Sequence, residues 1–155
     1  MGCEITALAM LINYTVKAEL DVLAAEMPRA ENPYEGFRGD PASTNYGWTI
    51  FPPALIEMTE KYLGSAVDMS GCEPDDLKEK LAEGKPVMVW IRGLGWPVHA
   101  LCLTGYDQDG FYYNDPATGE KDVFIEYEEF YFIWSDPIID NYLRITFSPK
   151  IAMSY

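Results

Sequence analysis

The sequence predicts an α+β fold in which N-terminal helices pack on a C-terminal antiparallel sheet. In the first half of the chain apolar residues recur at helical spacing, whereas the second half consists of short β-branched or aromatic runs separated by Gly and Asp turns. Helices and strands that are segregated along a chain are typical of α+β domains. With 155 residues and 48% hydrophobic content, the chain has the size of one ordinary domain with a full core, so residues 1–155 are expected to form a single domain.

Four helices are expected before the sheet. The first begins at or near Cys3 and runs to Tyr14, because apolar residues keep a helical period over this segment. The second covers residues 17–26 and ends before a proline. The third and fourth, over residues 52–63 and 73–84, have Pro in the first turn and Gly at or just after the end, as helix termini favour.

Residues 28–48 form a long segment that is rich in Gly, Pro and Asn. Its apolar residues follow neither the helical nor the strand period. Irregular segments of this length inside a compact domain are usually binding loops or lids. The alternative is a surface insertion without a function. The possible substrate contacts on this segment are Tyr34, Phe37, Arg38 and Trp48, and Trp96 is a further candidate beside the cleft, although large aromatic side chains more often belong to the core.

The second half of the chain is expected to form the sheet. Antiparallel strands are predicted over residues 86–91, 99–106, 111–116 and 122–127. The "DQDG" sequence between the second and third of them is typical of a hairpin turn. A short helix and two more strands complete the chain, over residues 128–134, 141–147 and 151–155.

Composition excludes several classes of function. The chain has 11 basic and 25 acidic residues, a net charge of −14, and no Lys/Arg-rich run, so it would repel nucleic acid and anionic lipid. The longest apolar run, over residues 87–91, is far shorter than the roughly 20 residues of a membrane-spanning helix. Three cysteines without C-x-x-C spacing predict neither a disulfide framework nor a thiolate metal site.

No metal or other cofactor is expected. Asp107 and Asp109 of "DQDG" have the spacing of a calcium loop. The next ligand position, however, is Phe111, which offers no side-chain oxygen. The sequence therefore favours a simple hairpin turn at this point.

The opening "MGCEIT" has two incompatible interpretations. It fits the pattern for N-terminal acylation of Gly2, with Cys3 available for a second lipid. Acylation requires residues 2–6 to be free and extended, whereas the apolar period makes them the first turn of a buried helix. The acidic chain also lacks the polybasic patch that a single acyl chain needs for stable anchoring. The second interpretation, in which Cys3 is a catalytic nucleophile, is therefore favoured.

A nucleophile at Cys3 needs a base and an orienting acid. His99 is the single histidine of the chain, and Asp115 follows it by 16 residues, on the other strand of the predicted hairpin. Cys3 at a helix start, His99 as general base and Asp115 as orienting acid would form a nucleophilic triad. The helix end and an adjacent imidazolium are expected to lower the pKa of Cys3. Asn114 is a rival orienter, but on an extended strand it faces the opposite way from Asp115.

Each of these residues also has a purely structural interpretation. A cysteine at a helix start is more often a small buried hydrophobe than a nucleophile. A lone histidine is usually structural, and Asp before Pro is common turn chemistry. The residue pattern alone leaves the catalytic and the structural interpretations open.

Seven segments in order along the chain resemble the bacteriocin-processing (double-glycine) peptidase-like proteins, cysteine peptidase family thirty-nine-like, of the papain-like clan. The segments are "GCEITALAMLINY", "PYEGFRGDP", "YGWTIFPPAL", "LAEGKPVMVW", "HALCLTGYD", "YYNDP" and "AMSY". The resemblance implies a papain-like cysteine peptidase fold, with Cys3 as nucleophile, His99 as general base and Asp115 as orienter. It also implies a peptide or protein substrate and a secreted or cell-surface location in a Gram-positive bacterium.

The sequence departs from the family at its beginning. Members carry a Gln several residues before the nucleophile, which is expected to help form the oxyanion hole, whereas here only Met1 and Gly2 precede Cys3. We therefore expect that an N-terminal segment is missing. Because loss of one oxyanion donor costs about 10²- to 10³-fold in turnover, two alternatives stay open. They are a weak or inactive peptidase fold that binds peptides, and another thiol hydrolase or amidase.

Overall fold

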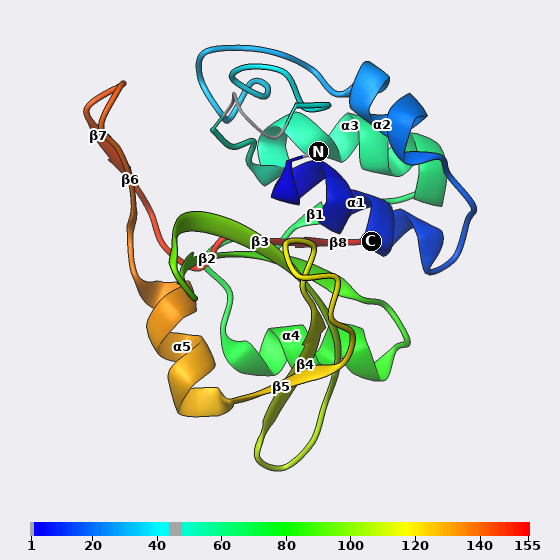
Figure 1. Ribbon diagram of the computed structural model, residues 1–155. Helices are drawn as coiled ribbons and strands as arrows, with labels where there is room; N and C mark the ends of the chain where they lie inside the picture. Colours follow the sequence, from blue (N-terminus) through cyan, green and yellow to red (C-terminus); the bar gives the residue numbers. More distant parts are fainter. Residues whose placement is uncertain (1, 44–47) are drawn as a thin grey trace.

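The computed structural model describes residues 2–43 and 48–155; Met1 and residues 44–47 of the predicted binding loop lie outside this description (Figure 1). The helices gather in the first half of the chain and the longer strands in the second, so the α+β prediction is confirmed. In chain order the elements are α1 Cys3–Asn13, α2 Leu20–Glu26, α3 Pro52–Leu63, β1 Val67–Asp68, α4 Pro74–Ala82, β2 Val87–Gly93, β3 Trp96–Tyr106, β4 Gly110–Asn114, β5 Val123–Glu126, α5 Tyr127–Ser135, β6 Ile138–Asp140, β7 Ile145–Phe147 and β8 Ala152–Ser154.

A six-stranded antiparallel sheet lies at the centre of the fold, in the order β1-β8-β2-β3-β4-β5. The last strand of the chain, β8, is inserted between β1 and β2, so the C-terminal residues complete the sheet. β6 and β7 pair only with each other and form a separate hairpin that projects from the body of the molecule (Figure 1).

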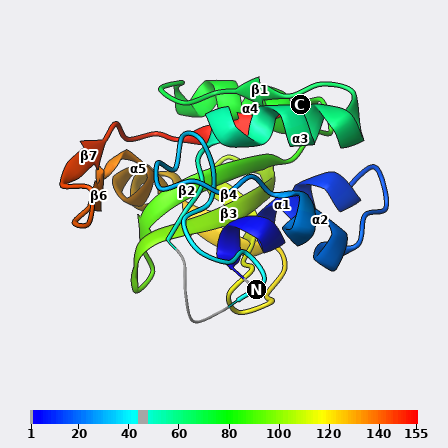
Figure 2. The ribbon, with the colours of Figure 1, turned by 90° about the horizontal axis from the view of Figure 1, so that it is seen from above.

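Helices cover both faces of this sheet. Helices α1, α2 and α3 lie on one side, whereas α4 and α5 lie on the other (Figures 1 and 2). The alternation of side chains along β2 explains the two cores, because Met88 and Trp90 enter the first cluster while Val87, Val89 and Ile91 enter the second. The predicted packing of N-terminal helices on the sheet is thus correct, and α4 and α5 add a layer on the opposite face.

The predicted hairpin around "DQDG" is present as β3 and β4. Asp107 shapes its turn, because its Oδ1 accepts hydrogen bonds from the backbone N–H groups of Asp109 and Gly110, at 2.7 and 3.1 Å. Its Oδ2 accepts the hydroxyl proton of Tyr112 at 2.8 Å. The carboxylate oxygens of Asp107 are therefore used to close the turn.

Several element boundaries and two strands differ from the sequence expectation. β4 ends at Asn114, two residues earlier than expected, and β7 begins at Ile145, four residues later. Helix α2 begins at Leu20, and β3 begins at Trp96 because Leu94 and Gly95, both with positive φ, make a tight turn after β2. β5 begins at Val123, one residue after the predicted start. The strands β1 and β6 were missed, since segments of two and three residues are too short to show a period.

No helix in the described residues is both long enough and apolar enough to cross a membrane.

Gly110 provides a test of the hairpin geometry. A Cβ atom at this position would collide with the carbonyl oxygen of Ile125 on β5, whereas a Cβ at Gly105 would meet no atom within 4 Å. We expect Gly110→Ala to lower the free energy of unfolding by about 1 to 3 kcal/mol, as overpacking generally does. Gly105→Ala in the same hairpin is the control and should change it by less than about 0.5 kcal/mol. Urea denaturation measures both, and equal effects would contradict the close approach of β4 and β5.

Candidate active site

Cys3 is the first residue of α1, and the helix start is anchored to the long loop. The backbone N–H of Gly2 donates to the carbonyl oxygen of Pro41 at 3.2 Å. The Gly2 carbonyl accepts both the backbone N–H and the hydroxyl of Thr6, at 3.2 and 3.1 Å. The residues that follow Gly2 are therefore the first turn of a helix, as the apolar period predicted, and not the free extended segment that acylation requires.

The surroundings of Cys3 oppose its ionisation. Its side chain is half-buried, and burial together with the charges of Glu4 and Asp115 raises the pKa of the thiol to about 11. The expectation of a lowered pKa is therefore wrong for the free protein. The physical reason is that desolvation and two nearby carboxylates outweigh the weak field of the helix end. Since Asp115 influences the thiol, the acid and the thiol lie in the same region of the molecule.

His99 and Asp115 form a buried hydrogen-bonded pair. His99 lies on β3 and Asp115 directly follows β4, and the Nε2 atom of His99 lies 2.9 Å from Oδ1 of Asp115. The same oxygen accepts the backbone N–H of Ala117 at 2.8 Å, which fixes the carboxylate. Because a carboxylate only accepts hydrogen bonds, Nε2 carries the proton and Nδ1 keeps a free lone pair.

The free Nδ1 atom is buried and makes no hydrogen bond to any described residue. The indole ring of Trp96 stacks on the imidazole, with ring centres 5.3 Å apart and planes inclined by 18°. Burial lowers the pKa of His99, although the hydrogen bond that His99 donates to Asp115 acts in the opposite direction. The resting imidazole is therefore neutral and has a basic nitrogen available. Among the described residues, no hydrogen bond joins it to the sulfur of Cys3.

The structure brings the thiol's helix and the imidazole's strand together. α1 packs against β3, and its N-terminus lies next to the loop that follows β4 in both ribbon views (Figures 1 and 2). Asn114, the rival orienter, points elsewhere, and its Oδ1 accepts the backbone N–H of Asp122 at 2.9 Å. Asp115 is thus the residue that holds the imidazole.

Glu4 is a buried acid that the sequence interpretation missed. It follows Cys3 in the first turn of α1 and is only 3% exposed, and it makes no ion pair with any described residue. Burial raises the pKa of its carboxyl to about 7, partly offset by its own N–H and by Thr49. The Thr49 hydroxyl lies near it without a hydrogen bond of normal geometry. The sequence did contain a sign of this burial, because Glu4 shares the apolar face of the helix with Leu8 and Leu11.

The five predicted substrate contacts have different environments. Trp96 is 45% exposed over His99, so it remains available to a ligand. Phe37 is a correction, because it is only 3% exposed and its ring packs next to Gly2, where it supports the start of α1. Tyr34 packs edge-on against Phe147, with ring centres 5.3 Å apart, and belongs to an aromatic cluster.

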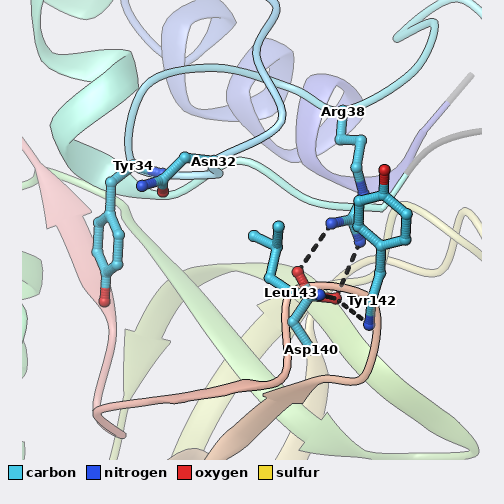
Figure 3. Close-up of polar contacts among 6 residues, drawn as sticks. All are labelled: Asn32, Tyr34, Arg38, Asp140, Tyr142 and Leu143. Carbon is cyan, nitrogen blue, oxygen red and sulfur yellow. Dashed lines mark hydrogen bonds and ion pairs between the residues drawn. The ribbon is translucent and has the colours of Figure 1, made fainter.

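Arg38 links the long loop to the β6–β7 hairpin (Figure 3). Its two terminal nitrogens donate to both carboxylate oxygens of Asp140, at 2.8 and 3.1 Å. The guanidinium also lies 4.6 Å from the ring centre of Tyr142 and 5.1 Å from that of Trp48. Arg38 is therefore fully engaged within the protein and is not a free contact.

Asp140 is a second buried acid that was missed. It is 1% exposed, and Oδ1 accepts the backbone N–H groups of Tyr142 and Leu143, at 3.0 and 3.3 Å. Burial alone would raise its pKa, but Arg38 and these N–H groups hold the pKa below its usual range. The sequence feature that could have indicated this burial is a single acid directly after the apolar run "PII".

Comparison with known sequences decides the family. The family model described as the peptidase C39-like family matches residues 1–136. The chain belongs to this family. Its fold is also that of a crystal structure of a Bacillus anthracis protein assigned as a C39-like peptidase, with a TM-score of 0.80 and 26% identity, over 99% of this chain and 88% of that one. The predicted resemblance is thus confirmed, and the chain is a member of a cysteine peptidase family.

A curated relative of the C39-like chain is the uncharacterized protein YvpB of Bacillus subtilis (strain 168). The two are 28% identical over 145 residues, which cover 74% of this chain. The chain spans 58% of the length of YvpB.

The raised pKa of Glu4 predicts an unusual dependence of stability on pH. The unfolded chain loses this proton near pH 4.5 and the folded chain near pH 7, so the free energy of unfolding falls as pH rises through this window and is constant above it. The loss is about 3 kcal/mol. Relative to Glu4→Gln, which cannot ionise, the native protein should become less stable by this amount between pH 4.5 and 8. Urea denaturation at several pH values measures the difference, and a constant difference would contradict the burial of Glu4.

Proposed function

We propose that the protein is a cysteine peptidase that hydrolyses a peptide bond with Cys3 as nucleophile, His99 as general base and Asp115 as the residue that orients the imidazole. The observation that supports this proposal is the buried neutral imidazole, with Nε2 held by Asp115 and Nδ1 without a partner among the described residues. A base with one fixed and one free nitrogen is what nucleophilic catalysis by a thiol requires. The substrate is a peptide or protein.

In the first step the substrate carbonyl approaches Cys3. Because the thiol and the imidazole are both neutral at rest, Nδ1 takes the proton from sulfur as the S–C bond forms. The products of this step are a tetrahedral oxyanion and an imidazolium, whose positive charge Asp115 stabilises through the hydrogen bond to Nε2. Coupling of proton transfer to attack avoids a free thiolate in a half-buried, negatively charged site.

In the second step the imidazolium gives its proton to the leaving amine. The C–N bond breaks, and the acyl group remains on the sulfur of Cys3 as a thioester. His99 then takes a proton from water, which attacks the thioester carbonyl. As the C–S bond breaks, the proton returns to sulfur, so the acid product leaves and the neutral thiol and imidazole are restored.

The oxyanion requires donors near the start of α1. The backbone N–H groups of the first turn are suited to this role, since the N-cap residue Gly2 has no side chain that could cap them. The chain has one glutamine, Gln108, which lies in the β3–β4 turn, beyond the end of β3 that is remote from His99.

The second candidate is a peptide-binding protein that cleaves slowly or not at all. The observation that favours it is the thiol pKa of about 11, which keeps Cys3 protonated at neutral pH. A thiol amidase that uses the same three residues is a further form of the first candidate. Substitution of the triad separates these functions.

Hydrolysis of a mixture of internally quenched peptides tests the proposal. Cys3→Ala should abolish it, and His99→Ala and Asp115→Asn should each lower it by about 10²- to 10⁴-fold, because the base is lost or its tautomer is no longer fixed. Cys72→Ala is the matched control, since Cys72 is also half-buried with a thiol pKa of about 11.

Full activity in the Cys72 variant and none in the Cys3 variant supports the proposal. Cleavage that survives in the Cys3 variant contradicts it. Binding of peptides by the native protein without any cleavage would favour the second candidate.

A further inference from the structure

A pocket with a volume of about 440 Å³ lies between the long loop and the turn of the β6–β7 hairpin. The described residues that line it are Glu31, Arg38, Gly39, Trp48 and Tyr142. The lining residue Arg38 pairs with Asp140, which lies 102 positions further along the chain (Figure 3). The pocket is therefore built by tertiary structure and not by one local turn.

The segments that form this pocket also contact the elements that carry the candidate catalytic groups. Phe37, which precedes the lining residue Arg38, packs against Gly2 beside Cys3. On the other side, β6 ends at Asp140 and contacts β3, the strand that carries His99. The two sides of the pocket are thus connected to the elements that carry the thiol and the imidazole.

The charge in the pocket is negative. The charged lining residues are Glu31 and Arg38, and the Arg38 guanidinium is paired with the carboxylate of Asp140. The pair is neutral as a whole, so the charge of Glu31 is left uncompensated. Glu31 is exposed in the pocket and makes no ion pair with any described residue. The net charge of −14 of the whole chain adds to the attraction for a cation.

Aromatic rings complete the pocket. Tyr142 is 70% exposed, yet the guanidinium of Arg38 lies over its ring at 4.6 Å and holds it in place. Trp48 forms another part of the lining and is steadied by Arg38 in the same way, at 5.1 Å. A pocket lined by aromatic rings and a carboxylate attracts a Lys or Arg side chain, whose stem packs on a ring and whose charge interacts with the carboxylate.

We infer that this pocket is a substrate subsite that accepts a basic side chain, Lys or Arg, of the peptide, an inference that rests on the proposed function. Glu31 supplies the charge that selects the cation, and Tyr142 supplies the surface on which its stem packs. An acidic side chain would be repelled by Glu31 and would find Arg38 already occupied by Asp140. An apolar side chain would contact the rings but would gain nothing from Glu31.

The test measures binding without catalysis. The full chain with Cys3→Ala is titrated against three pools of fluorescein-labelled pentapeptides, identical except that the central residue is Lys, norleucine or Glu, and fluorescence anisotropy gives the affinities. The Lys pool should bind about threefold to tenfold more tightly than the norleucine pool, and the Glu pool most weakly. Adding Glu31→Gln should reduce the preference for Lys to less than about twofold.

Glu57→Gln is the matched control. Glu57 lies in a separate groove of about 510 Å³ that Glu26, Pro28, Ala54, Met58 and Lys61 also line, so its loss should leave the preference for Lys unchanged. Equal binding of the Lys and norleucine pools, no binding of any pool, or a preference that survives Glu31→Gln would each overturn the inference. Preserved selective binding by a native protein that cleaves no peptide would instead refute the peptidase proposal and leave the subsite standing.

Discussion

The hydrogen bond between Nε2 of His99 and Asp115 is the interaction on which the candidate site depends. His99 is completely buried, and a buried imidazole without a partner for its N–H would be costly. The partner comes from the register of the β3–β4 hairpin, which the Asp107 turn closes, and from the turn after β4 that begins at Asp115. By fixing the proton on Nε2, the hairpin determines that Nδ1 is the nitrogen left free to act as a base.

A second constraint shapes the other side of the site. The irregular loop after α2 has little regular structure of its own, and its form depends on contacts to distant segments. Arg38 reaches Asp140 across the chain, and the paired charges are largely withdrawn from water. Removal of either partner would leave the other charge buried and unpaired, which is strongly destabilising. The same loop carries Phe37, which packs against Gly2, so the position of the nucleophile is linked to that of the hairpin β6–β7.

The parts of the candidate site that depend on local sequence patterns could be predicted. The helix that begins at Cys3, and the hairpin that joins His99 to Asp115, follow from period and turn chemistry, because both are set within a few residues of the chain. The burial and the contacts of the Phe37 and Arg38 side chains could not be predicted in this way. The two residues are adjacent in a segment without a period, and only tertiary packing decides that one is buried and the other bound to an acid.

The sign of the pKa change at Cys3 was missed for a related reason. A helix end and a nearby histidine can be inferred from sequence, but the amount of desolvation cannot. Glu4 contributes as well, since its position beside the thiol is visible in the sequence whereas its burial is a result of the packing of α1. At rest the thiol and the imidazole are therefore both neutral, and charge separates only during the attack on the substrate.

The most direct test of this account is a ¹⁵N-edited NMR spectrum of the imidazole ring, which is unambiguous because the chain has a single histidine. At pH 7 the ring should be neutral, with the proton on Nε2 and an unprotonated Nδ1, and its titration midpoint should lie below the usual 6.5. An imidazolium at pH 7 would show a preformed thiolate–imidazolium pair, and a proton on Nδ1 would show that the base is blocked. Either result would contradict the account.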